Sequence, residues 1–183
     1  MPTIRLVEAD QAPLLARPHY AGGDPGPIVA ALAQVPELLE VALPFFDTTL
    51  GPSALGWRTK ELVIVRTSAL LGCRYCTQTH MVVALKAGLS RPEVLALTGP
   101  APPGPAFPDP AERALLGWVQ AVAGTAPVPA QARSALTAHW ADHEIVELTL
   151  LVGVTMMLNR FATALELPTG AGTLRRLRKE ALL

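Results

Sequence analysis

The chain has 183 residues, of which 50% are hydrophobic and 16% are charged, and its formal net charge is zero. A balanced charge argues against a nucleic-acid partner, because proteins that neutralise a phosphate backbone usually carry an excess of basic residues. The hydrophobic content excludes a disordered chain, which would have few hydrophobic residues and a large net charge. We therefore expect residues 1–183 to form a single domain with one hydrophobic core.

The sequence contains no segment that predicts export or membrane insertion. Its N-terminus lacks the basic residues and apolar stretch of a signal peptide. The longest uncharged run, 114–132, is interrupted by glycines and prolines, and the apolar run 148–158 is shorter than the roughly 20 residues of a membrane helix. We expect a cytoplasmic protein, in which a close pair of cysteines is more often catalytic or metal-binding than a structural disulfide.

The 18 prolines divide the chain into helical stretches and connectors. Proline is costly inside a helix, so the two proline-free windows, 53–91 and 130–167, are where long helices are able to run. Apolar residues show no strand-like alternation, which predicts an all-α fold. The remaining prolines cluster in an N-terminal arm at 1–26 and in a proline-rich connector at 99–110. The predicted helices cover residues 27–34, 36–49, 58–71, 74–87, 90–97, 109–123, 129–139, 142–165 and 172–182.

Several residues mark where these helices begin and end. Gly72 and Gly88 each follow an apolar stretch and predict helix C-termini. Ser90 followed by a glutamate three residues later predicts a capping box, and Asp109 with Glu112 shows the same pattern.

A shift of 86 residues produces an internal similarity. It aligns residues 61–62 with 147–148 and residues 74–75 with the similar pair 160–161. Two interpretations are open: shared helical patterning, or a duplicated helix pair whose second copy has lost its cysteines.

Two cysteines and a histidine form the motif that carries chemistry. Cys73 lies where a helix begins, and the N–H groups there stabilise an anion and lower a thiol pKa. Cys76 follows within the first turn, close enough for a disulfide after a modest adjustment. His80 lies one turn beyond Cys76 on the same helix face, and a thiol beside an imidazole is the arrangement of an activated nucleophile.

Glu61 is the natural third member of this group, because a carboxylate early in an apolar helix is able to orient or charge-balance His80. Glu61 lies eleven residues before Gly72. That is about 16 Å of helix, against about 12 Å on the arm that carries His80. The two helices must therefore be offset or cross at an angle for these side chains to meet.

Other interpretations of the motif are weaker than a redox dithiol. Zinc could take Cys73, Cys76, His80 and Glu61 as ligands, but structural zinc sites usually draw on two separated pairs. Covalent haem needs a histidine directly after the second cysteine, where this chain has Thr77. A thioredoxin-like fold would place the motif after a strand. A non-redox helical binding module with a vestigial motif remains a further alternative.

The pattern Glu-x11-Cys-x2-Cys-x3-His resembles the signature of the carboxymuconolactone decarboxylase-like superfamily. Within it, the chain is similar to the alkylhydroperoxidase D-like (AhpD-like), peroxidase-related branch. The resemblance extends over about residues 43–167 and includes the segments 85–90, 109–114 and 144–161.

This resemblance implies an all-helical domain that assembles into trimers, hexamers or other homo-oligomers. It implies reduction of hydroperoxides by a redox pair, Cys73 and Cys76, with His80 and Glu61 as proton-relay partners and no cofactor or metal. The reductant would be an external dithiol, on a lipoyl or thioredoxin-like protein. The best-studied peroxidases of this type have a histidine where this chain has Tyr75. True carboxymuconolactone decarboxylases lack the cysteine pair, which disfavours the lactone reaction.

The expected mechanism begins when His80, held by Glu61, deprotonates Cys76. The thiolate attacks a peroxide oxygen and becomes a sulfenic acid. Cys73 condenses with it to a disulfide, which an external dithiol reduces by exchange. The order of the cysteines stays open, because proximity to His80 favours Cys76 as the attacking residue whereas the helix start favours Cys73.

Overall fold

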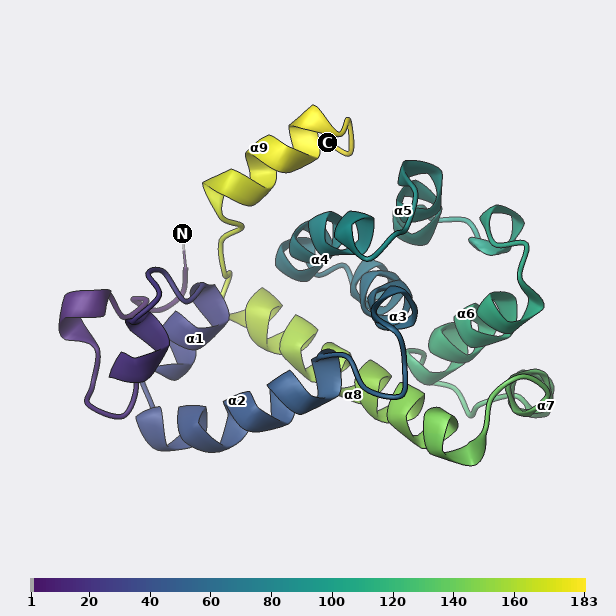
Figure 1. Cartoon of the computed structure of the whole chain (residues 1–183), viewed down its shortest axis with the longest axis horizontal. Helices are drawn as coiled ribbons and strands as arrows, with labels where there is room; N and C mark the ends of the chain where they lie inside the picture. Colours follow the sequence, from purple (N-terminus) through teal and green to yellow (C-terminus); the bar gives the residue numbers. More distant parts are fainter. Residues whose placement is uncertain (1) are drawn as a thin grey trace.

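A computed structural model describes residues 2–183, so the first residue of the predicted arm lies outside the described residues. Within that range the chain forms α-helices and short 3-10 turns and no β-strand, which confirms the all-α fold. Every predicted helix is present, with ends within three residues of those expected (Figure 1). The helices are α1 (Pro27–Leu32), α2 (Pro36–Leu50), α3 (Trp57–Leu70), α4 (Arg74–Lys86), α5 (Arg91–Thr98), α6 (Pro110–Val122), α7 (Ala130–Thr137), α8 (Asp142–Ala164) and α9 (Ala171–Lys179).

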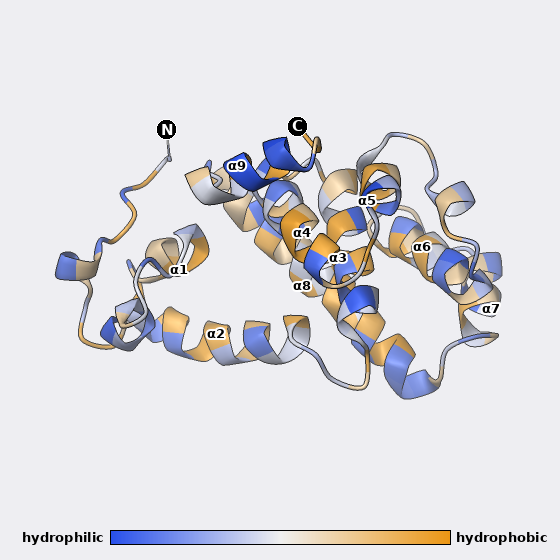
Figure 2. Cartoon of the chain, turned by 45° about the horizontal axis from the view of Figure 1, so that its top comes forward, coloured by the Kyte–Doolittle hydropathy of each residue, from blue (hydrophilic) through white to orange (hydrophobic). Residues whose placement is uncertain are grey.

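Helix α3 lies at the centre of the molecule. It contacts α4, α5, α6 and α8, and residues 60–68 are all buried. Figure 2 shows the hydrophobic residues of α3 and α4 at this centre and the hydrophilic α9 along one side. An apolar helix covered by neighbours on most sides is what its sequence predicts.

A Schellman motif ends α3 and fixes the start of α4. Gly72 has a φ of +64°, and the Cys73 N–H donates to the Ser68 carbonyl at 3.0 Å. Glycine adopts this left-handed conformation without steric cost. Cys73 is at the same time the N-cap of α4. The two helices are therefore joined by a tight turn of three residues that ends at Cys73, and Cys76 follows in the first turn of α4.

The two predicted capping boxes have different outcomes. Ser90 and Glu93 form the reciprocal pair that the sequence predicts. Asp109 caps α6, but Glu112 does not complete a box, and that part of the prediction is wrong. Glu112 instead accepts from Arg58 Nε at 2.9 Å, because a charge-assisted bond to a guanidinium is stronger than one to a backbone N–H.

The interpretation of the internal similarity as a duplicated helix pair is also wrong. A second copy would need a break near residues 158–159, where α8 runs without interruption from Asp142 to Ala164. Leu158 stands where the first copy has Gly72, and a leucine favours continuation of a helix. The internal similarity is therefore shared helical patterning.

A buried lysine joins three helices near the site. Lys60 on α3 is fully buried, and its Nζ donates to the carbonyl of Thr49 at 2.9 Å and to that of Gly51. The same nitrogen lies 2.7 Å from Glu147 Oε1 on α8. A cation at the C-terminus of α2 satisfies carbonyls that the helix leaves free. Lys60 therefore fixes the end of α2 against α3 and α8.

The N-terminal arm packs against the cysteine region. The Thr3 N–H donates to the Leu165 carbonyl at 3.0 Å. Ile4 and Leu6 pack against the apolar cluster that contains both cysteines. The arm therefore covers part of this region instead of extending into solvent.

Helices α2 and α8 also expose large apolar side chains. These are Leu38, Val41 and Phe45 on α2 and Val146, Leu150 and Met157 on α8. By length and composition, α8 is the one described helix that could cross a membrane. This is weak evidence of a membrane span, because a core helix of a globular protein has the same composition, and α8 packs against α2, α3, α4 and α6.

Candidate functional site

The structure brings Glu61 and His80 into direct contact. His80 Nδ1 lies 2.9 Å from Glu61 Oε2 and 3.2 Å from Oε1, so the helices are offset as the sequence distances required. Glu61 is 2% exposed and the His80 side chain 24%. Because a carboxylate only accepts, Nδ1 carries the hydrogen, and Nε2 is left for proton exchange.

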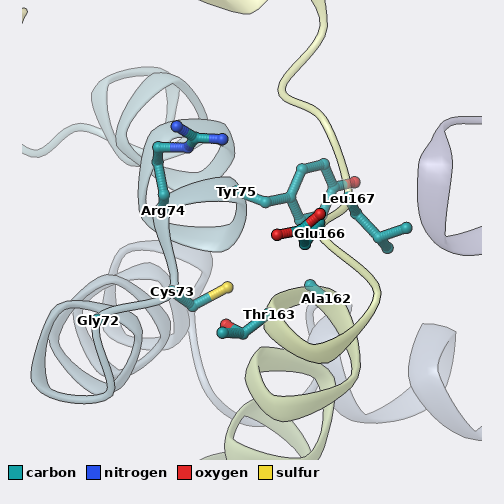
Figure 3. A pocket seen from close by; sticks show the side chains of 8 residues that line it. All are labelled: Gly72, Cys73, Arg74, Tyr75, Ala162, Thr163, Glu166 and Leu167. Atoms are coloured by element: carbon teal, nitrogen blue, oxygen red, sulfur yellow. The ribbon is translucent and has the colours of Figure 1, made fainter. Parts of the chain in front are cut away.

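Cys73 occupies the N-cap of α4, where its sulfur accepts from the Cys76 N–H at 3.4 Å. The Cys76 thiol, with this N–H, the Thr163 hydroxyl and the Tyr75 backbone, lowers the pKa of Cys73 to about 6 in spite of burial. Figure 3 shows the Cys73 sulfur and the Thr163 hydroxyl side by side. Cys73 is therefore the thiol that ionises at neutral pH.

Cys76 behaves in the opposite way. Its hydrogen bond with Cys73, together with burial and the Cys73 charge, raises the pKa of the Cys76 thiol. Both cysteines are free thiols and both are buried. The reduced pair thus carries its charge on Cys73, with the Cys76 S–H as a donor to it. At rest, Cys76 is therefore a thiol, which must lose its proton before it is able to attack a peroxide.

Cys76 and His80 line the same apolar cavity, of about 170 Å³. No hydrogen bond joins them directly among the contacts of residues 2–183, and the cavity that both line has room for a small molecule. The apolar walls of this Cys76 cavity come from α1, α2, α3 and α8 and are Ile28, Phe46, Leu50, Ile64 and Leu158.

Cys73 faces a second cavity, of about 360 Å³, between α4 and the end of α8. Arg74, Thr163 and Glu166 give this Cys73 cavity a polar lining (Figure 3). Glu166 has a φ of +52°, an uncommon conformation for a residue other than glycine. Tyr75 lines both cavities and so lies between them, and burial raises its pKa to about 12.

Ser68 and Thr163 are site residues that the sequence motif does not include. Ser68 lines the Cys76 cavity, and it lies seven residues after Glu61, two turns along the same face of α3. That spacing is a signal by which it could have been found. Thr163 comes from α8, far along the chain, and no local pattern pairs it with Cys73.

The four ligands of the zinc interpretation do not form a metal-binding group. Residues 2–183 contain no group of three or more His, Cys, Asp or Glu side chains that could hold a metal ion. The tetrahedral site that the zinc interpretation requires is therefore not formed.

Comparison with known proteins agrees with this geometry. Residues 36–121, which include the whole motif, match the model of the Carboxymuconolactone decarboxylase family. No curated protein resembles the chain closely enough to count as a match. Residues 36–121 are therefore similar to this family, and the chain as a whole has the AhpD-like helical fold.

Three solved structures share this fold. An Agrobacterium tumefaciens protein of unknown function, suggested to be the antioxidant defence protein AhpD, is 28% identical with a TM-score of 0.65 over 77% of this chain and 96% of its own. A peroxidase-related protein from Ralstonia eutropha is 18% identical with a TM-score of 0.82 over 94% of each chain. The debrominase Bmp8, bound to 2,3,4-tribromopyrrole, is 17% identical with a TM-score of 0.79 over 98% of this chain and 100% of its own.

Replacing Thr163 by valine is expected to raise the pKa of Cys73, because the thiolate loses a hydroxyl donor. In the wild type, the ultraviolet absorbance of thiolate should rise with pH through a midpoint of about 6. In Thr163→Val the midpoint should move to higher pH, whereas Thr163→Ser keeps the donor and should leave it in place. Equal midpoints in all three proteins would contradict this role of Thr163.

Proposed function

We propose that this protein is a thiol-dependent hydroperoxide reductase, within a superfamily whose members are peroxidase-related or decarboxylase-like enzymes. One observation carries the proposal. Cys76 and His80 line one apolar cavity, while the neighbouring Cys73 lies one helical turn away and is able to form a disulfide with Cys76.

The proposed reaction begins with the reduced pair, a Cys73 thiolate and a Cys76 thiol, and it consumes one further proton, which His80 delivers. The proton shared by the sulfurs moves to Cys73, and the Cys76 thiolate attacks one peroxide oxygen. The O–O bond breaks, Cys76 becomes a sulfenic acid, and the alkoxide takes its proton from His80. The Cys73 thiol then attacks the Cys76 sulfur, which forms the disulfide and releases water.

An external dithiol completes the cycle by thiol–disulfide exchange, and we place its attack at Cys73. The Cys73 cavity is larger and more polar than the Cys76 cavity. Exchange gives an oxidised donor, a Cys73 thiolate, a Cys76 thiol and a proton that returns to His80. Tyr75, between the cavities, would keep peroxide and reductant on separate sides of the cysteine pair.

The size of the Cys76 cavity supports small apolar hydroperoxides as substrates. A dry cavity of about 150 Å³ is large enough to hold benzene. The roughly 170 Å³ here would therefore accept a tert-butyl or phenyl-sized group. We expect cumene and tert-butyl hydroperoxides to be reduced with a higher kcat/KM than hydrogen peroxide, which leaves the apolar walls uncovered.

The test is consumption of hydroperoxide by the purified protein, with dihydrolipoamide, a reduced thioredoxin or dithiothreitol as the donor. We expect turnover that needs both peroxide and dithiol. Parallel reactions offer 2,3,4-tribromopyrrole, the ligand of the debrominase structure, and a carboxymuconolactone. Turnover of either of these, with no consumption of hydroperoxide by any donor, would refute the proposal.

Three expectations drawn from the sequence remain predictions. They are homo-oligomeric assembly, a cytoplasmic location and a single domain. The exposed apolar side chains of α2 and α8 are a surface that such an assembly would cover. Sedimentation analysis that found only a monomer would contradict the first of them.

A further inference from the structure

Ser68 has an unpaired hydroxyl beside the Cys76 cavity. The residue is fully buried on α3. Its Oγ has no hydrogen-bond partner among residues 2–183. It nevertheless lines the cavity together with Cys76 and His80. A buried hydroxyl without a partner is costly, at about 1–3 kcal/mol. A ligand oxygen that accepted from this hydroxyl would remove the cost.

Two other polar groups of the cavity already have partners. The Thr155 hydroxyl donates to the Leu151 carbonyl at 2.7 Å. His80 Nδ1 is held by Glu61. The hydroxyls of Tyr75 and Thr79 on α4 also line the cavity, so Ser68 supplies the free hydroxyl on the α3 side that a ligand oxygen in this space would meet.

We propose that Ser68 donates a hydrogen bond to the departing oxygen of the hydroperoxide when Cys76 attacks. This inference rests on the proposed function. As the new S–O bond forms and the O–O bond breaks, the electron pair goes to the departing oxygen. Ser68 stabilises this developing alkoxide by its hydrogen bond and keeps its own proton. The proton that completes the alcohol comes from His80.

The backbone of Ser68 has a separate task, which makes the side chain testable alone. Its carbonyl accepts the Cys73 N–H at the end of α3. Any substitution keeps this carbonyl. The change Ser68→Ala therefore removes the hydroxyl while the Schellman motif and the position of Cys73 are retained.

Thr67 supplies a matched control. It is also fully buried on α3, and its Oγ1 also lacks a partner in the described range. Thr67 does not line the Cys76 cavity. The change Thr67→Val removes an unpaired buried hydroxyl of the same helix without touching the substrate space.

The experiment compares the steady-state kinetics of wild type, Ser68→Ala, Ser68→Thr and Thr67→Val with cumene hydroperoxide. We expect Ser68→Ala to lower kcat and kcat/KM together by roughly 10- to 100-fold, since a transition-state donor is lost. Ser68→Thr, which keeps a hydroxyl, should recover much of this loss. Thr67→Val should stay close to wild type.

A second readout separates catalysis from folding. Ring-substituted cumene hydroperoxides differ in the acidity of the departing alcohol. Without the Ser68 donor, kcat/KM should depend more steeply on that acidity. An unchanged dependence, or equal losses in Ser68→Ala and Thr67→Val, would overturn the inference while the proposed function stands. A wild-type protein that consumes no hydroperoxide would overturn both.

Discussion

Replacing Cys76 by serine is expected to abolish the dithiol-dependent consumption of hydroperoxide, with a loss of about 10³-fold or more. Cys76 is the cysteine that lines the apolar cavity with His80. A serine hydroxyl in its place is too weakly acidic to supply an anion, and removal of a nucleophile costs an enzyme most of its rate. The assay is the donor-coupled reaction with cumene hydroperoxide.

The matched variant is Cys73→Ser, which we expect to separate the first step from the rest of the cycle. Serine is a good N-cap, so the start of α4 should be retained. Cys76 should then form a sulfenic acid more slowly, because the Cys73 thiolate that takes its proton is absent, and the reaction should stop there, because no thiol is present to resolve it. Dimedone labelling and mass spectrometry would detect one adduct at Cys76. Continued turnover by Cys76→Ser, with a sulfenic acid at Cys73, would reverse the order of the cysteines.

Local sequence signals were sufficient for the helices and for the centre of the motif. Helix ends depend on proline, glycine and capping residues that act within one turn, and Gly72 and Ser90 illustrate this. The relation of Cys73, Cys76 and His80 is likewise set by spacing along one helix. Glu61 could be named because a carboxylate is unusual in an apolar helix, although its contact with His80 depends on how α3 and α4 pack.

The parts that the sequence did not predict all depend on packing between distant segments. Thr163 and Glu166 reach the Cys73 cavity because α8 ends beside α4, and no spacing along the chain encodes this. Glu112 accepts a hydrogen bond from Arg58 on another helix, in place of the backbone N–H at the start of its own helix. For Glu112, a contact between helices outweighs a signal within one helix.

The different roles of Cys73 and Cys76 could not be predicted from the sequence either. Sequence reasoning gave two opposing arguments, the helix start for Cys73 and the nearby imidazole for Cys76. In the structure both observations hold, but at different stages of the proposed cycle. Cys73 carries the charge at rest, and Cys76 faces the cavity where a substrate would bind. A shared proton between neighbouring sulfurs reconciles the two arguments.

Replacing Lys60 by methionine is expected to lower the free energy of unfolding by roughly 3 kcal/mol. Breaking a buried ion pair by removing one partner costs about 3–5 kcal/mol, and the lower end applies because Glu147 is 23% exposed. The carbonyls of Thr49 and Gly51 would lose their donor at the same time. Urea unfolding at neutral pH measures the change, with Glu147→Gln as a milder control that keeps an acceptor.

The pH dependence of this loss follows from Glu147. Burial alone would raise the pKa of Glu147, but Lys60 and Ser53 hold it below its ordinary value of 4.5. A lowered carboxyl pKa contributes stability that is complete above the unfolded value and is lost as pH falls through the folded value. The difference between wild type and Lys60→Met should therefore narrow below about pH 4.5. A difference that stayed constant at low pH would show that the ion pair contributes nothing.

The change Lys60→Met should also weaken substrate binding. Lys60 anchors the C-terminus of α2, and α2 supplies Phe46 and Leu50 to the wall of the Cys76 cavity. When that end of α2 becomes more mobile, Phe46 and Leu50 no longer hold fixed positions in the cavity wall. KM for cumene hydroperoxide should then rise, while the rate with hydrogen peroxide, which does not use the wall, changes less. Equal effects on both peroxides would mean that Lys60 supports the fold but not the shape of the cavity.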